Sequence, residues 1–416
     1  MASARRIDSG FPISHDTYNG IGVASDGCVY YVLCTESWTE GGRAFRYDPR
    51  TERVDSVIDL TVACGGTGAV PQSKSHVNFE EHAGKLYFAT HVGIYSVVDG
   101  REVMPIPPDG MGQYPGGHFL SYNLASGAVE DVGLAPHGEG ILTMALDGPR
   151  GRAYGITWPY GHLVVCDIAA RTVRDLGRIS EDGEAKGGPT YRTLCRSLRV
   201  DPRDGSVYFT VSEGWIMRLP LGADHWHRVE GDDLRKDYFG QYEVSSPGHM
   251  AYNWRQTVWY EPEGAIYGVH GNSGYLFRFD PRAEGVDVLD RITSSNSRRS
   301  GMFDQFSYGY LGLALGPDCR TLYYLTGGPI YENGRRVAGK ASTARGEAKG
   351  HENLHLITYD IVHRRYRDHG PVLFEDGERP SYVNSIAVTE NAVYAISRVS
   401  PTPGAHSDLM EISLVG

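Results

Sequence analysis

The sequence predicts an all-β chain folded as a seven-bladed β-propeller, and three observations lead to this prediction. A short strand centred on a tyrosine recurs seven times, at Tyr30, Tyr87, Tyr154, Tyr208, Tyr267, Tyr323 and Tyr394. The 416 residues include 53 glycines, 22 prolines and 27 tyrosines, which is typical of many short strands joined by turns. No stretch of the sequence shows sustained helical periodicity.

Each repeat is predicted to supply four strands. An apolar first strand and a turn precede each tyrosine, as in SLRVDPRDG, and a third strand such as WIMRLP follows it. The fourth strand often carries Asp-x-Gly, as in EDVG, RDLG and RDHG. The seventh repeat ends at Gly416 without a fourth strand, whereas RRIDSG near the N-terminus has the same pattern. We therefore expect the N-terminal strand to pair with the last blade and close the ring of a single domain spanning residues 1–416.

The second repeat contains the sequence SHVNFEEHAGKLYFATHVG. A turn centred on residues 83–84 makes the numbers of cross-strand partners sum to 167, so that Glu80 faces Tyr87 and His76 faces His91. Opposed side chains of an antiparallel pair lie on the same side of the sheet, with Cβ atoms about 4.5–5.5 Å apart. The sequence therefore predicts that two imidazoles share one small space.

One face of the disc is predicted to carry the function. The connections from second to third strand and from blade to blade lie on this face, and they are long, as at residues 92–117. Long loops on a rigid scaffold are where binding residues gather. Fifteen residues at the starts of first strands and the ends of second strands fall around the channel mouth on this face: His15, Asn19, His76, His91, His137, Trp158, Arg192, Arg196, Asn253, His270, Tyr308, Tyr310, Tyr382, Asn384 and Arg398. We expect them to form one pocket.

Two of these histidines are the candidates for proton transfer. Histidine titrates nearest to neutral pH, and two imidazoles in contact titrate as a coupled pair. His76 and His91 are therefore expected to act as base and acid in one turnover. Arg196 is the candidate for binding a substrate carboxylate through its forked guanidinium, while Arg192 either does the same or forms an ion pair with a loop carboxylate.

The other mouth residues are expected to bind substrate. Trp158, Tyr308 and Tyr310 either stack on a sugar ring or pack in the propeller core. The other candidates for substrate binding are His15, His137, His270, Tyr382 and Asn384.

Composition excludes several classes of function. A formal net charge of −11 argues against nucleic acid as the partner, and no apolar run reaches the roughly 18 residues of a membrane span. The N-terminal residues lack the apolar core of a signal peptide, so a cytoplasmic protein is expected unless a leader was removed. Six cysteines without CxxC spacing indicate reduced, mostly buried thiols. No P-loop, dinucleotide fingerprint or Ser-His-Asp signature is found, so no cofactor is expected to be required; a divalent cation in the central channel stays open.

Seven repeats with a histidine at each end of the second hairpin resemble the propeller polysaccharide lyases, namely the ulvan lyases and the L-rhamnose-α-1,4-D-glucuronate lyases. The resemblance implies β-elimination at a uronic acid. Histidine and tyrosine would remove the C5 proton and assist loss of the 4-O-linked group, while arginine neutralises the carboxylate. His76 and His91 match the family's histidine positions. Where the family has its tyrosine and arginine, this sequence has His137 and Trp158.

The leading expectation is a carbohydrate-active lyase with His76, His91 and Arg196 as catalytic residues. Its substrate would be a uronate-containing oligosaccharide or a related small carboxylated molecule. One alternative is a rhamnosidase-like glycoside hydrolase, whose product would contain no double bond. Another is a non-catalytic propeller that binds a glycan or a protein through a histidine-poor, aromatic-rich face.

Overall fold

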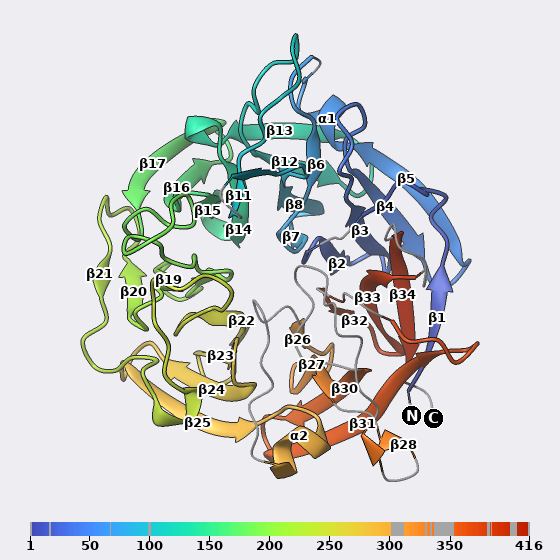
Figure 1. Ribbon diagram of the computed structural model, residues 1–416, viewed down its shortest axis with the longest axis vertical. Coiled ribbons are helices and arrows are strands. Elements are labelled where there is room, and N and C mark those ends of the chain that lie inside the picture. The colour runs from blue at the N-terminus through green and yellow to red at the C-terminus, as the bar shows by residue number, and fades with distance from the viewer. Residues whose placement is uncertain are drawn as a thin grey trace.

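The computed structural model describes residues 2–15, 18–66, 68–98, 101–300, 312–328, 331–332, 335–336, 353–380, 383, 385–399 and 406–414. Four of the predicted pocket residues, Tyr308, Tyr310, Tyr382 and Asn384, lie outside these ranges. In the described residues the chain is all-β, and its sheets stand around a common centre in chain order (Figure 1).

Five sheets have four strands each. The first contains β2 (Ile21–Val23), β3 (Val29–Leu33), β4 (Arg43–Asp48) and β5 (Arg53–Asp59). The second contains β7 (Glu80–His82), β8 (Lys85–Ala89), β12 (His118–Asn123) and β13 (Val129–Leu134). The third contains β14 (Gly140–Asp147), β15 (Arg152–Trp158), β16 (His162–Asp167) and β17 (Thr172–Arg178). The fourth contains β18 (Arg199–Val200), β19 (Val207–Thr210), β20 (Ile216–Leu219) and β21 (His227–Arg228). The fifth contains β22 (Trp254–Tyr260), β23 (Ala265–His270), β24 (Tyr275–Asp280) and β25 (Gly285–Arg291).

The sixth sheet has eight strands and includes the N-terminal strand. In order they are β26 (Leu313–Leu315), β27 (Thr321–Gly328), β30 (Asn353–Asp360), β31 (Arg365–Phe374), β1 (Ala2–Ile7), β34 (Ser407–Ser413), β33 (Ala392–Arg398) and β32 (Ala387–Val388). β1 pairs antiparallel with β34, where Arg5 faces Glu411, and parallel with β31, where Ser3 faces Leu373. The predicted pairing of the N-terminal strand with the last strands is confirmed.

The remaining elements are short. Three two-stranded ladders join β6 (Gln72–Lys74) to β9 (His91–Val92), β10 (Ser96–Val98) to β11 (Arg101–Val103), and β28 (Tyr331–Glu332) to β29 (Arg335–Arg336). The helices are α1 (Leu60–Ala63) and α2 (Ser295–Ser300), with 3-10 turns at Pro136–Gly138, Gly148–Arg150 and Asp237–Phe239. No helix in the described ranges is both long and apolar enough to cross a membrane. All six cysteines are free and four of them are buried, as expected.

Two of the recurring tyrosines, Tyr30 and Tyr267, tie their second strand to the turn before it. The Tyr30 ring packs between two sheets, with centroids 6.3 Å from Phe79 and 5.7 Å from Tyr122, and its hydroxyl donates to Asp26 at 2.9 Å. In the fifth sheet the Tyr267 hydroxyl likewise donates to Glu263, four residues earlier, at 2.9 Å. A buried tyrosine whose hydroxyl reaches the turn fills the core without leaving a polar atom unpaired.

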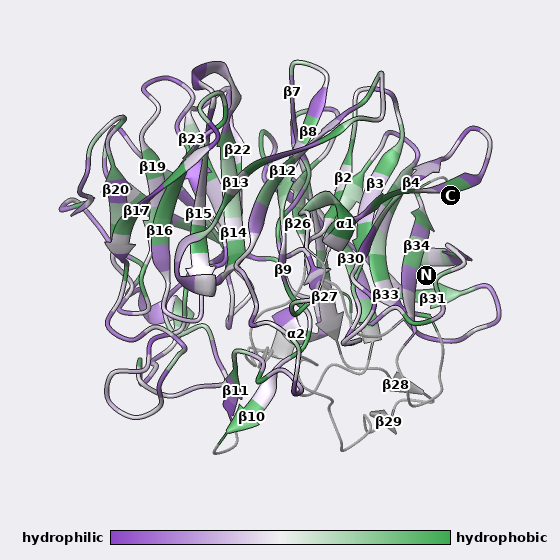
Figure 2. Cartoon of the chain, turned by 90° about the horizontal axis from the view of Figure 1, so that it is seen from above, coloured by the Kyte–Doolittle hydropathy of each residue, from purple (hydrophilic) through white to green (hydrophobic). Residues whose placement is uncertain are grey.

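The two faces of the disc differ as the loop lengths predict. The β10–β11 hairpin and α2 project from the same side of the sheets (Figure 2). The hairpin lies between a second and a third strand, and α2 lies between two sheets, so both belong to the long connections. The long connections therefore place the candidate site at the strand ends on this side of the disc.

Candidate functional site

The two histidines of the second repeat lie where its strands are interrupted. β7 and β8 pair as predicted, with Glu80 facing Tyr87. Beyond this stretch the register changes, and the residue paired with His91 is Lys74 instead of His76. The predicted backbone partner of His91 is therefore wrong by two residues. The imidazoles nevertheless meet, with ring centroids 4.3 Å apart, so the predicted shared space is confirmed.

Aromatic rings enclose this histidine pair. Tyr18 stacks on His76, with centroids 4.7 Å apart and planes at 5°. On the other side, the Trp158 ring lies 5.6 Å from His91, and Tyr95 lies 6.2 Å from His91 and 5.3 Å from Trp158. Trp158 thus packs against the pair. Tyr18 and Tyr95 were not predicted from the sequence.

Burial keeps both imidazoles neutral at neutral pH. His91 is 1% exposed, and burial lowers its pKa to about 3, with Lys74 and Arg196 adding to the effect. Burial, together with His91 and the nearby cations, also holds the pKa of His76 well below its usual range. A protonated imidazole is disfavoured here because the surroundings are apolar and already positive.

One nitrogen of His91 is assigned by its hydrogen bond. Nδ1 lies 2.8 Å from the carbonyl oxygen of Val92, and because a carbonyl can only accept, Nδ1 carries the proton. In the neutral ring Nε2 therefore presents its lone pair. The Nε2 atoms of His76 and His91 are buried, and no described residue forms a hydrogen bond with either. Buried polar atoms of native proteins are nearly always paired, so these two adjacent atoms can each take a hydrogen bond from a water or a ligand.

Backbone contacts hold the pair in position. A Cβ atom at Gly140 would lie 2.8 Å from Cγ of His91, so only glycine lets β14 approach the ring this closely. On the other side, Asn19 donates to the backbone oxygen of His76 at 3.3 Å, and Gln256 donates to Asn19 at 2.8 Å. This chain of contacts links the first, second and fifth sheets around the pair.

Cations surround the histidines. Lys74 is 3% exposed; its Nζ lies 4.8 Å from the Tyr95 ring centroid and 5.5 Å from that of Tyr18. No carboxylate of the described residues lies within ion-pair distance of Lys74. Arg255, 3% exposed, also lowers the pKa of His76 through its charge. Lys74 could have been found in the sequence, because it stands two residues before His76 in an extended segment and so shares its side.

Arg196 belongs to this cluster, but its guanidinium is already engaged. It forms a 2.7 Å ion pair with Glu184 and donates to the carbonyl of Leu194 at 2.8 Å. Glu184 also accepts a hydrogen bond from Trp158 Nε1 at 3.1 Å. A substrate carboxylate would therefore have to share Arg196 with Glu184. No carboxylate of the described residues pairs with Lys74, so Lys74 could bind a substrate carboxylate alone.

The predicted role of Arg192 in binding substrate is not supported. Its guanidinium pairs with Glu213 at 2.5 Å and Glu181 at 2.8 Å, and it also donates to two backbone carbonyls. All three nitrogens are used, so the alternative prediction, an ion pair with loop carboxylates, holds.

The three other predicted histidines contact different groups. His15 forms a β-bridge with Cys34, and its Nδ1 lies 3.1 Å from Glu36. His137 pairs with Asp175 at 2.8 Å. His270 is fully buried and stacks on Phe239, with centroids 4.3 Å apart. The single pocket expected from the sequence is thus reduced, among the described residues, to the cluster around His76 and His91.

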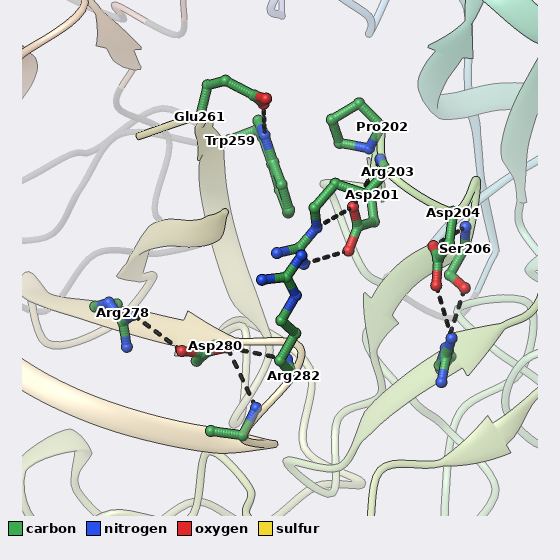
Figure 3. Close-up of polar contacts among 12 residues, drawn as sticks. Asp201, Pro202, Arg203, Asp204, Ser206, Trp259, Glu261, Arg278, Asp280 and Arg282 are labelled. Atoms are coloured by element: carbon green, nitrogen blue, oxygen red, sulfur yellow. Dashed lines mark hydrogen bonds and ion pairs between the residues drawn. The ribbon is translucent and has the colours of Figure 1, made fainter. Parts of the chain in front are cut away.

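A hollow of about 370 Å³ lies on the opposite face, among the short turns that follow β18 and β24. Figure 3 shows its ionic lining, in which Arg203 forks onto Asp201 beside Trp259. Asp204 likewise pairs with Arg218 at 2.8 Å. Because these charges compensate one another and no histidine lines the hollow, we do not assign it to the site.

Comparisons with known proteins support the fold. No protein-family model matches the chain, and no curated protein matches it in sequence. The Cps50 (Swd1) β-propeller domain of Myceliophteria thermophila aligns with a TM-score of 0.54 and 9% identity, covering 97% of this chain and 99% of that one. A fungal alcohol oxidase of the AA5 family in complex with copper aligns with a TM-score of 0.57 and 10% identity. The alignment covers 99% of this chain and 76% of the oxidase chain. The alignment with an oligogalacturonate lyase from Vibrio parahaemolyticus covers 99% of this chain and 93% of the lyase chain at 8% identity. Its TM-score is 0.48, and at this value the likeness supports no conclusion. At such identities the comparisons show the fold alone, and that fold is a β-propeller.

Proposed function

We propose that this protein is a carbohydrate-active lyase that cleaves a C–O bond at a uronic acid by β-elimination. The supporting observation is the contact between His76 and His91 at 4.3 Å, with both Nε2 atoms buried and no described hydrogen-bond partner for either. The adjacent Lys74, buried and without a carboxylate partner in the described ranges, adds a site for an anion. A neutral base beside a cation that no described carboxylate neutralises is what abstraction of a proton next to a carboxylate requires.

The substrate carboxylate would sit against Lys74, with Arg196 adding positive charge. The negative charge of the bound carboxylate would raise the pKa of both imidazoles from their depressed values and so make them stronger bases. Nε2 of His91 would then accept the C5 proton, and the electron pair would pass into an enediolate stabilised by Lys74.

The second half of the reaction returns the proton. The C4–O bond breaks as the C4=C5 double bond forms, and the leaving oxygen takes a proton from the imidazole pair. One proton leaves C5 and one reaches the leaving group, so the pair ends each turnover in its starting state. Contact between the two rings is what permits this exchange.

We also propose that the ring has seven blades. The eight-stranded sheet divides at the parallel pairing of β31 with β1, since strands within each half pair antiparallel. Each half then has four strands, like the other five sheets.

The test is turnover of uronate-containing oligosaccharides, followed by the ultraviolet absorbance of the conjugated enoate product. We expect His76→Ala and His91→Ala each to lower turnover by about 10²- to 10⁴-fold, the usual contribution of acid–base catalysis. Lys74→Met keeps the buried stem but removes the charge, and is expected to cost about 10²- to 10³-fold. His227→Ala, at an exposed position of β21, is the control and should turn over like the wild type.

Product analysis separates the alternatives. New reducing ends without enoate absorbance would indicate a glycoside hydrolase. Binding of the oligosaccharide without any product would indicate a non-catalytic propeller. Full turnover in both histidine variants would remove the assignment of His76 and His91.

A further inference from the structure

A histidine–aspartate pair recurs in three sheets. In each, a histidine at or near the start of the third strand bonds to the aspartate of Asp-x-Gly in the fourth. The pairs are His118–Asp131, His162–Asp175 and His355–Asp368, with distances of 2.8, 2.9 and 3.0 Å. In each sheet the glycine amide donates to the same aspartate, and the register between the two strands shifts at this point. By itself, then, the pair is a structural feature of the fold.

The third sheet adds a second histidine. His137, in the turn before β14, places its Nε2 2.8 Å from Asp175, and its ring centroid lies 4.5 Å from that of His162. One ligand atom from each of the three residues lies within 4.8 Å of the others. In the part of the chain that the structure describes, no other group of three such residues is found.

His137 is held in an uncommon conformation. Its φ of 63° lies in the left-handed region, which a non-glycine residue adopts at an energetic cost. This conformation brings the imidazole over a pair that the fold has already formed. The result is a cluster of two imidazole nitrogens and one carboxylate whose ligand atoms lie within 4.8 Å of one another.

We infer that His137, His162 and Asp175 form a binding site for a divalent first-row transition metal, with Zn²⁺ as the representative ion. Two imidazole nitrogens and a carboxylate suit such ions better than Mg²⁺ or Ca²⁺, which prefer oxygen ligands. The Gly177 amide donates to Asp175 Oδ1 at 2.8 Å and so orients the carboxylate.

The site has room for a further ligand. The His137 side chain is 53% exposed, whereas the paired histidines of the second and sixth sheets are 8% and 6% exposed. Water or a substrate oxygen can therefore complete the coordination. This inference does not depend on the proposed lyase activity, because it rests on different residues.

The experiment is Zn²⁺ binding to the full chain after chelation and dialysis, measured by calorimetry and by metal content after gel filtration. We expect one Zn²⁺ per chain and no comparable binding of Mg²⁺. His137→Asn removes the imidazole but tolerates the left-handed conformation, so folding should be preserved. This variant is expected to bind Zn²⁺ at least about tenfold more weakly.

A matched control comes from another exposed histidine–aspartate pair. His363 lies 2.9 Å from Asp360 and is 50% exposed, without a third ligand among the described residues. His363→Asn should bind Zn²⁺ like the wild type. Zn²⁺ should also raise the melting temperature of the wild type and of His363→Asn, but not of His137→Asn. Equal Zn²⁺ affinity in the wild type and His137→Asn would overturn the inference.

Discussion

Six of the described histidines fall into two groups according to their surroundings. His118, His162 and His355 each contact an aspartate. His76, His91 and His270 are buried with no described carboxylate within ion-pair distance, and burial lowers the pKa of each. A buried imidazole is therefore charged only when the protein or a ligand supplies an anion.

The second group should make stability depend on pH. Burial lowers the pKa of His270 to about 3, against an ordinary value of 6.5. Between these values the unfolded chain binds one more proton than the folded chain, so the free energy of unfolding falls as pH falls, by about 1.4 kcal/mol per pH unit for each such histidine. We expect His270→Gln to reduce that slope by about this amount. The measurement is urea unfolding from pH 6 to pH 4.

The control for this prediction is His227→Gln, because His227 is exposed. Its slope should equal that of the wild type. If His270→Gln and His227→Gln give the same slope, His270 is not neutral in the folded protein at these pH values.

At the scale of the element, the second hairpin shows what the sequence could and could not predict. The turn fixed the register of β7 and β8, because Ala83 and Gly84 have the positive φ values of a tight hairpin. The register near His76 was missed because β6 is bonded to the first sheet's loops: Thr35 donates to the Ser73 oxygen at 3.1 Å, and Gly42 donates to the Gln72 oxygen at 3.0 Å. Contacts with another sheet override local pairing and cannot be read from the hairpin alone.

The first residue of β14 gives a test of how tightly the pair of His76 and His91 is held. In Gly140→Ala, the new Cβ would lie 2.8 Å from Cγ of His91, so the imidazole has to move. A displacement of about 1 Å at a reacting group can cost about 10²-fold in rate. Overpacking at a site of this kind costs about 1–3 kcal/mol of stability. We therefore expect a large loss of enoate formation at a temperature where the variant remains folded.

Gly285 provides the matched control for this substitution. It is also the first residue of a strand, β25, and a Cβ there would meet nothing within 4 Å. Gly285→Ala should retain both turnover and melting temperature. Wild-type turnover in Gly140→Ala would show that the position of the His91 ring is not critical.

At the scale of the whole molecule, periodicity was the most informative part of the sequence. The recurring tyrosines and Asp-x-Gly segments predicted the sheets, and RRIDSG predicted the pairing of β1 with β34. The site was predicted only in part. His76 and His91 were found because they flank one hairpin in the sequence, whereas Tyr18, Arg255 and Gln256 come from other repeats. Their approach depends on the packing of sheets around the channel, which no local pattern encodes.

Ring closure gives the last prediction. Ala4 of β1 is 2% exposed and lies between two strands, opposite Ile412 on β34 and Phe374 on β31. A carboxylate at this position would be buried without a partner, and we expect Ala4→Asp to lower the free energy of unfolding by about 3 kcal/mol or more. The neighbouring Ser3 is exposed on the same strand, so Ser3→Asp adds the same charge where water can solvate it. Thermal and urea unfolding of the two variants should differ clearly. Equal stability would mean that β1 does not hold the two ends of the ring together, since a strand that is detached in solution would solvate either carboxylate equally well.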